Sequence, residues 1–198
     1  MFRTFRTFRL LSLLGSLLLL TGCLFDNPPS GPSQSIDTWL VGQWETKDKS
    51  GHTCRTVVAP ASSSHYRISL SGLKGGTQDF DAWIGRVDGF SILILKSLNE
   101  GPSVGKYALF HYELISPAMP EPGNIGATRI RLSELQLDES CRSLDSYKLR
   151  AAIRQGLKEG TLLAPYDVVA DRKGKTVETP GSVIWTKTGG VTLSGETF

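Results

Sequence analysis

The sequence predicts a mainly β domain, an antiparallel meander that forms a barrel or half-barrel and carries one α-helix late in the chain. Apolar and polar residues alternate with a period of two in several short segments, which is the pattern of strands with one buried face. Glycine-rich turns at residues 74–76 and 87–89 separate these segments, as expected for a meander. Closing such a meander into a barrel removes its exposed strand edges.

Four of the predicted strands follow one another in the first half of the domain. Residues 66–70 and residues 80–84 alternate between apolar and polar side chains. Residues 90–95 form a nearly continuous apolar run, and residues 107–115 are long enough for a full strand. Because only short turns separate several of them, we expect neighbouring strands to be antiparallel.

A change of phase marks the next strand. Ile130 and Leu132 share one phase of the alternation, whereas Leu135 and Leu137 share the other. One extra residue in a strand shifts its alternation in this way. The pattern therefore predicts a β-bulge near residues 133–134.

Residues 145–159 predict the late helix. Its apolar positions recur at i, i+4 and i+8, at Leu149, Ile153 and Leu157. Ser143 or Asp145 can cap the helix at its start, and Gly160 ends it. Two further extended segments follow, at residues 166–170 and 183–186.

The N-terminal segment resembles the signal peptide of a bacterial lipoprotein. Its positive region is formed by Arg3, Arg6 and Arg9. The apolar run at residues 10–20 is shorter than the roughly 20 residues that a membrane-spanning helix needs, which argues against an uncleaved anchor. Leu20-Thr21-Gly22-Cys23 resembles the lipobox. The resemblance implies that the Cys23 thiolate is alkylated with diacylglycerol, that the chain is cut before Cys23, and that the new N-terminus is acylated, commonly with palmitate.

Residues 24–35 are rich in proline, glycine and serine, a composition that favours an extended and mobile segment. We therefore expect a tether that holds the domain away from the bilayer. Leu24 occupies the position where an Asp would resemble the inner-membrane retention signal of enterobacteria, so the sequence favours the outer membrane, facing the periplasm. The expected organisation is a signal peptide at 1–22, a lipidated tether at 23–35, a β domain at 36–188 and a flexible tail at 189–198.

The charge of the processed chain indicates its partners. The whole chain has 22 Lys and Arg against 19 Asp and Glu, and residues 1–22 contain three arginines and no acid. The processed chain is therefore neutral and lacks the basic surface that nucleic acids require. The expected partners are the membrane, through the lipid anchor, and either an apolar small molecule or an envelope protein.

Two cysteines, Cys54 and Cys141, remain after Cys23 is assigned to the lipid. In an oxidising compartment outside the inner membrane they would most simply form a disulfide. The alternative is two buried thiols. A metal site at His52 and Cys54 finds no further ligands at a suitable spacing, so we expect no metal and no cofactor.

Val41-Gly42-Gln43-Trp44 resembles the G-x-W motif that opens the first strand of lipocalin-like barrels. The order of the elements that follow, from residues 66–70 to the late helix, resembles a family of uncharacterised bacterial lipoproteins with such a barrel. The resemblance covers most of residues 40–188 and implies a lipocalin-like fold in the cell envelope, without an assigned activity. Trp44 is then expected to be a buried aromatic that closes one end of the barrel.

Three patterns are typical of enzymes, and none of them predicts an activity. Residues 101–105 match G-x-S-x-G, but this motif needs a strand-to-helix turn, and here it joins two predicted strands. His111 and Glu113 share one face of a strand, as do Asp79 and Asp81. Polar residues on the solvated face of a sheet explain both pairs, so the sequence predicts a protein that is not an enzyme.

Two function classes remain open. A lipocalin-like barrel can hold a small apolar ligand or a lipid if its interior contains a cavity. Alternatively, the domain binds another envelope protein through loops such as residues 116–126, an insertion rich in proline and glycine. Large inward residues such as Tyr66 and Phe80 favour a filled core over a cavity.

Overall fold

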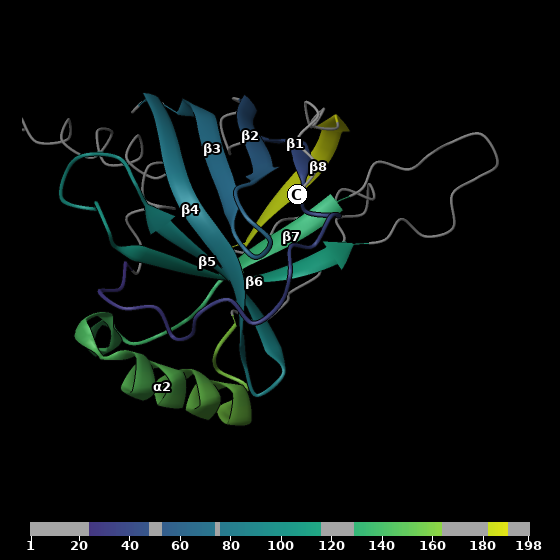
Figure 1. Cartoon of the computed structure of the whole chain (residues 1–198). Helices are drawn as coiled ribbons and strands as arrows, with labels where there is room; N and C mark the ends of the chain where they lie inside the picture. Colours follow the sequence, from purple (N-terminus) through teal and green to yellow (C-terminus); the bar gives the residue numbers. More distant parts are fainter. Residues whose placement is uncertain (1–23, 48–52, 74–75, 116–128, 164–181, 190–198) are drawn as a thin grey trace, which may run out of the picture.

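A computed structural model describes residues 24–47, 53–73, 76–115, 129–163 and 182–189. Within these ranges, eight antiparallel strands pair in chain order, and β8 also pairs with β1, so that the sheet closes into a barrel (Figure 1). The strands are β1 (Gly42–Lys47), β2 (Thr53–Pro60), β3 (Tyr66–Leu73), β4 (Gly76–Val87), β5 (Phe90–Ser97), β6 (Tyr107–Ile115), β7 (Arg129–Glu134) and β8 (Ser182–Gly189). The short 3-10 helix η1 (Glu139–Ser143) and the helix α2 (Ser146–Glu159) follow β7. The predicted antiparallel meander with one late α-helix is confirmed.

One strand, β2, has no counterpart among the predicted segments. Its side chains alternate between exposed and buried, with Cys54, Thr56 and Val58 on the buried side. Only Val58 of these three is strongly apolar, which explains why the sequence pattern is weak. The segment predicted at residues 166–170 lies outside the described residues.

The predicted bulge after β7 is wrong, because the strand ends there. β7 pairs with β6 and β8 without a shift of register, and it stops at Glu134. Leu132 points into the barrel, whereas Leu135 lies outside it, in the cluster beneath α2. The change of phase in the sequence therefore marks a switch from one hydrophobic core to the other.

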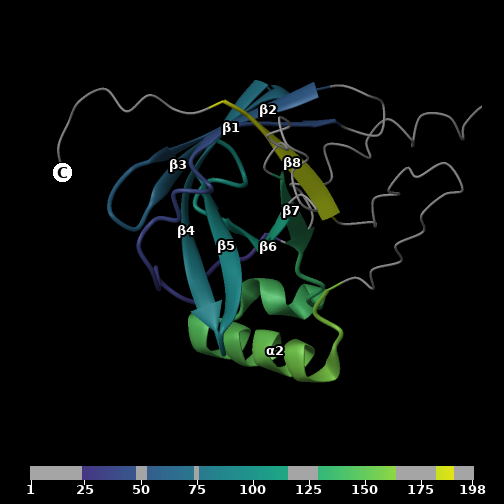
Figure 2. The same cartoon turned by 90° about the vertical axis from the view of Figure 1, so that its right-hand side faces the viewer.

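The central strands carry apolar side chains on both faces, because each face covers a different core. In β4, Phe80 and Ile84 point into the barrel, whereas Trp83 and Val87 point outward. The outward side chains pack with Leu149 and other residues of α2. Figure 2 shows α2 lying beneath β4 and β5, where it covers this outer face. The two cores explain why β5 appears in the sequence as a nearly continuous apolar run.

The boundaries of α2 follow from its caps. Asp145 is the N-cap, and its carboxylate oxygen accepts a hydrogen bond of 2.9 Å from the Lys148 amide. Gly160 ends the helix with φ of 68°, a left-handed conformation that glycine adopts without strain. Leu149 and Ile153 are fully buried on the side that faces the barrel. Of the two predicted N-caps, the structure therefore selects Asp145.

Trp44 anchors the start of the barrel in the way the sequence predicts. Its side chain is completely buried in the interior core. The indole Nε1–H donates a 2.9 Å hydrogen bond to the Leu40 carbonyl, which fixes the chain just before β1. Lys187 of β8 lies with its Nζ 5.5 Å from the centre of the indole ring, a cation–π contact across the β1–β8 seam.

The segment before β1 differs from the predicted mobile tether, because it lies against the barrel from residue 24 onward. Figure 1 shows residues 24–41, in purple, running across the barrel before the chain enters β1. Phe25 is only 1% exposed and exchanges two backbone hydrogen bonds of 2.9 Å with Tyr107. Further along, the Trp83 indole donates to the Ser30 carbonyl at 3.0 Å. We call residues 24–41 the leader.

Two features of the barrel explain why the leader can dock there. β7 ends early, so the Tyr107 end of β6 lacks its neighbour on that side, and Phe25 takes the vacant place. Gly85 of β4 leaves room for the leader, because a Cβ at this position would lie 2.1 Å from Ser30 Oγ. Prolines suit such an extended segment because they fix the backbone without needing an N–H partner.

Replacing Trp44 and Trp39 one at a time should distinguish a core tryptophan from a surface one by the loss of stability. Trp44→Ala should lower the free energy of unfolding by about 3–5 kcal/mol, because it leaves a large cavity in the interior core. Trp39→Ala should change it by less than about 0.5 kcal/mol, because the Trp39 side chain is 60% exposed. Urea unfolding followed by circular dichroism measures both. Equal losses in the two variants would contradict the placement of Trp44.

Candidate functional site

The predicted lipid site, Cys23, lies outside the described residues, but the residues that follow it are placed. Leu24 is half-buried and packs against the interior core, and Phe25 belongs to the outer core beneath α2. The Asp26 amide donates to the Arg142 carbonyl at 2.8 Å. The chain therefore meets the barrel beside η1 and the start of β6.

The barrel interior, which is the predicted ligand site, is occupied by side chains. Among the residues that the structure describes, thirteen buried ones form one cluster there: Leu40, Trp44, Val58, Tyr66, Ile68, Phe80, Ala82, Ile84, Leu93, Leu95, Ala108, Ile130 and Leu132. None of them is more than 6% exposed, and several are aromatic or large aliphatic residues. A carrier of apolar molecules needs inward positions that leave space, and these described positions are filled.

One end of the barrel, which we call the plugged end, is crossed by residues 33–41 of the leader. The Ser33 amide donates to the Ile84 carbonyl, and the Ile36 amide donates to the Ser63 carbonyl, both at 3.0 Å. Leu40 lies in the interior core. These contacts cover the end at which β4 turns into β5.

Asp37 is the polar centre of the plugged end. Its amide donates to the Tyr66 hydroxyl oxygen at 2.5 Å, and the Tyr112 hydroxyl donates to its carboxylate at 3.5 Å. Burial raises the pKa of Tyr66 to about 12 and also raises the pKa of Tyr112. Both hydroxyls therefore stay protonated and serve as hydrogen-bonding groups. Such an arrangement holds the leader in place and provides no activated nucleophile.

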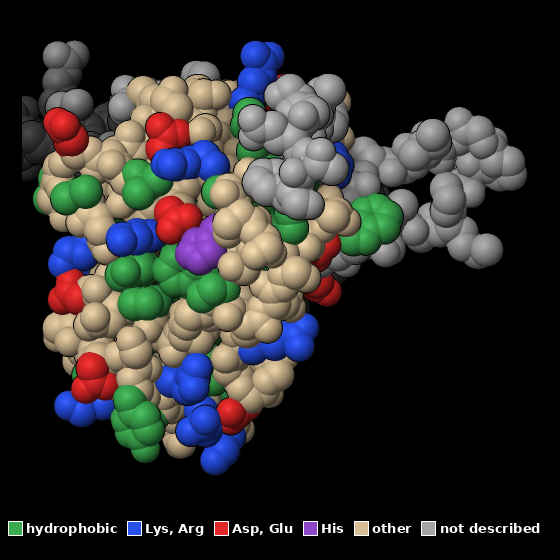
Figure 3. Space-filling model, viewed as in Figure 1, with side chains coloured by type: hydrophobic (Ala, Val, Ile, Leu, Met, Phe, Trp, Pro, Cys, Tyr) green, Lys and Arg blue, Asp and Glu red, His purple; other side chains and the backbone are tan. Residues whose placement is uncertain are grey.

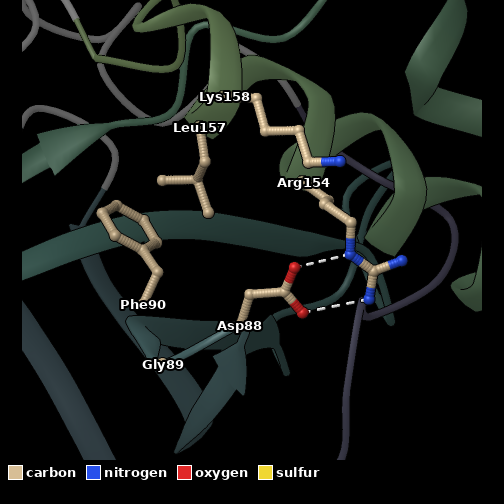
Figure 4. Close-up of a pocket in the computed structure, with 6 residues that line it drawn as sticks. All are labelled: Asp88, Gly89, Phe90, Arg154, Leu157 and Lys158. Atoms are coloured by element: carbon tan, nitrogen blue, oxygen red, sulfur yellow. Dashed lines mark hydrogen bonds and ion pairs between the residues drawn. The ribbon is translucent and has the colours of Figure 1, made fainter.

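An open hollow of about 450 Å³ lies between the β4–β5 hairpin and the last turns of α2 (Figure 4). Arg154 bonds both carboxylate oxygens of Asp88, at 2.6 and 3.0 Å, and this hydrogen bonding lowers the pKa of Asp88. Phe90 and Leu157 form the apolar side of the hollow, and Lys158 lies at its rim. Because Arg154 is engaged by Asp88, the hollow presents one uncommitted cation among these residues, too little for a defined anion site.

The charges on the surrounding surface offset one another. Figure 3 shows Lys and Arg side chains interspersed with Asp and Glu on the face seen in Figure 1. Exposed ion pairs join Arg55 to Glu45 and Lys106 to Asp26. No single sign of charge dominates this face.

The residue pairs that resemble enzyme sites are engaged elsewhere. His111 stacks on Phe90 with ring centres 4.5 Å apart, and burial lowers the pKa of His111. Glu113 accepts a 3.0 Å hydrogen bond from Arg131 on β7. Residues 101–105 lie in the loop between β5 and β6, which leads into a strand. The structure therefore gives His111 and Glu113 separate structural contacts and does not bring them together as an acid–base pair.

The two aspartates that share a face of β4 also have separate partners. Asp79 accepts a 2.5 Å hydrogen bond from the Ser69 hydroxyl, and Asp81 lies 3.1 Å from His65 Nδ1. Among the residues that the structure describes, no group of three or more His, Cys, Asp or Glu side chains is arranged to hold a metal ion. His52 lies outside that part of the chain.

The predicted disulfide is not formed between Cys54 and Cys141, although both side chains are buried. Cys54 alternates with Val58 on the inward side of β2, so it faces the barrel interior. Cys141 belongs to the core outside the barrel, beneath α2. The wall of the barrel separates the two residues, whereas a disulfide needs Cα atoms within about 7 Å.

No protein-family model, curated protein or solved structure matches the chain. Within the described ranges, no helix combines the length and the apolar character needed to cross a bilayer. The resemblance to lipocalin-like lipoproteins stays a prediction from the sequence, whereas the barrel itself rests on the strand pairing.

The sequence does not predict the docked leader or the role of Asp37. The signal was weak but present, because Phe25 is a large aromatic residue within a proline-rich segment. Trp39 and Leu40 immediately before the G-x-W motif likewise indicate a chain that is already packed when it reaches β1.

Replacing Tyr66 tests the plugged end. Tyr66→Phe should lower the free energy of unfolding by about 1–3 kcal/mol, because the Asp37 amide loses its acceptor. The difference in free energy of unfolding between the native protein and Tyr66→Phe should be smaller at strongly alkaline pH than at neutral pH. In the native protein, the contribution of Tyr66 to the free energy of unfolding should be fully present below pH 10. It should decline as the pH rises towards about 12, because only the unfolded chain releases the Tyr66 proton in that interval. Unfolding curves at several pH values measure this decline.

The matched control is Tyr147→Phe, since the Tyr147 side chain is 82% exposed. It should leave both the stability and its alkaline decline unchanged. If Tyr66→Phe keeps the full decline between pH 10 and pH 12, Tyr66 is not the group responsible.

Proposed function

We propose that this protein is a lipid-anchored domain of the bacterial cell envelope that works as a non-enzymatic protein-interaction module. The lipobox-like residues before Cys23 support the anchor, and Leu24 favours the outer membrane with the domain facing the periplasm. The filled interior of the barrel is the observation that carries the choice of module. A partner must then bind on the outside of the barrel or at its loops.

The filled interior favours this module over a carrier of apolar ligands. A drug-sized ligand is typically held in a cavity of roughly 300–1,000 Å³. Trp44, Tyr66 and Phe80 occupy the space where such a ligand would lie, and each is almost completely buried. The leader covers one end of the barrel as well. Binding a ligand inside would require several of these side chains to leave the core.

The polar groups near the barrel support a role without catalysis. His111, Glu113, Asp79 and Asp81 each have structural contacts, and the hydroxyl of Tyr66 bonds the leader. Catalytic groups are expected to converge on a shared cavity with perturbed pKa values. The four charged or titratable residues instead lie on β4 and β6, which β5 separates, whereas Tyr66 faces the barrel interior.

Replacing Cys23 tests the anchor. In the full chain expressed in a diderm bacterium, Cys23→Ser should abolish incorporation of labelled palmitate and move the protein from the membrane fraction to the soluble fraction. Cys54→Ala is the matched control, because Cys54 is buried within the domain, and this variant should still incorporate palmitate. Membrane attachment that survives Cys23→Ser would overturn the proposed lipid site.

The molecules that copurify or crosslink with the protein distinguish an interaction module from a carrier of apolar ligands. Native mass spectrometry of the protein extracted from cells should give the mass of the lipidated chain alone. Crosslinking in intact cells should return one recurrent envelope protein. A co-purified lipid or small apolar molecule at one copy per chain would instead favour the carrier, and crosslinks only to abundant neighbours would count against the module.

A further inference from the structure

We propose that the domain rests directly on the bilayer in one orientation, because the leader is docked on the barrel. The inference rests on lipid attachment at Cys23, as in the proposed function. The face turned to the lipids, which we call the anchor face, is formed by the β5–β6 loop (residues 98–106), by η1 and by the first turn of α2. The partner of this surface is the lipid–water interface of the membrane.

The reach of the chain limits how far the domain can move from its lipid. Consecutive Cα atoms are about 3.8 Å apart, so a lipid on Cys23 is attached within one residue of Leu24. Leu24 and Phe25 are already packed against the two cores of the barrel. A free segment of 12 residues would allow the domain to swing tens of ångströms from the membrane, at roughly 3.3 Å per residue. The docked leader removes that freedom.

Several hydrogen bonds dock the leader next to the lipid site. Phe25 and Tyr107 exchange two backbone hydrogen bonds, and the Asp26 amide donates to the Arg142 carbonyl. The Asn27 side chain donates to the Leu144 carbonyl at 3.1 Å. These contacts join the leader to β6, to η1 and to the residue before the helix cap. The first residues after the lipid are thus held by three parts of the fold.

The composition of the anchor face suits contact with lipids. Five large apolar side chains are exposed among the described residues, and three of them belong to this face: Leu98 (36%), Val104 (55%) and Tyr147 (82%). Leu98 and Val104 lie in the loop that leads to Lys106, which forms an ion pair with Asp26. Tyr147 lies three residues beyond Leu144. Tyrosine is enriched at the lipid–water interface, where its ring is apolar and its hydroxyl stays hydrated.

The opposite side of the barrel provides the reference position. In the closed order of eight strands, β2 stands four strands from β6 in either direction. Val57 lies on the outward side of β2 and is 40% exposed. Val104 and Val57 are therefore a matched pair of exposed valines, one on the anchor face and one on the far side.

The test places a fluorescent amino acid at position 104 or at position 57 of the full lipidated protein. The protein is reconstituted in vesicles of phosphatidylethanolamine and phosphatidylglycerol that carry a spin-labelled headgroup as quencher. Quenching at position 104 should exceed quenching at position 57 several-fold. Equal quenching in protein that floats with the vesicles would overturn the orientation.

A linker variant tests whether the docked leader causes the orientation. Inserting about ten Gly and Ser residues between Cys23 and Leu24 leaves the docked contacts intact and restores the missing reach. The ratio of quenching at the two positions should then fall towards one, and an unchanged ratio would overturn the role of the leader. Flotation is scored separately, because protein that never binds the vesicles contradicts the lipid anchor and not the orientation.

Discussion

The backbone pairing between β1 and β8 is the contact on which the rest of the structure depends. It joins the first strand of the sheet to the last, through pairs such as Glu45 with Thr186, which lie 141 residues apart in the sequence. Once the sheet is closed, the described strands form one inner face and one outer face. Trp44 and Lys187 meet across this seam, so the aromatic residue of the first strand supports the closure directly.

Closure also divides the apolar residues into two separate cores. The inner core is sealed by the wall of strands and by the leader at the plugged end. The outer core exists because β4, β5 and β6 have a second apolar face, which α2, η1 and Phe25 cover. The described side chains inside this barrel leave little volume for an internal ligand. The exposed charged and polar groups lie on the outside.

The elements that could be predicted are those whose signal is local. The period of α2, its Gly160 stop and the alternating segments of β3 and β4 are all readable from neighbouring residues. The predicted ends of the helix agree with those of the structure, because a carboxylate cap and a left-handed glycine each act within a single turn. β2 gave a weak pattern, since Thr56 and Cys54 occupy inward positions that are usually more apolar.

The features that could not be predicted depend on contacts between distant residues. The docking of Phe25 requires that β7 ends early beside Tyr107, which no local pattern reveals. The separation of Cys54 from Cys141 requires knowing on which side of the sheet each one lies. Composition alone favoured a mobile tether. Proline and serine are equally compatible with a docked extended segment, so composition could not distinguish the two.

The bridge between Phe25 and Tyr107 also sets an order of events for a chain that is processed at Cys23. In the folded domain the backbone of the residues next to that site is hydrogen-bonded to β6 and η1. An enzyme that must bind this backbone in its own active site could not reach it there. Cleavage and lipid transfer would then belong to the unfolded chain as it leaves the translocation machinery. Folding would follow, and the newly attached acyl chains would already fix the plane beside which the barrel assembles.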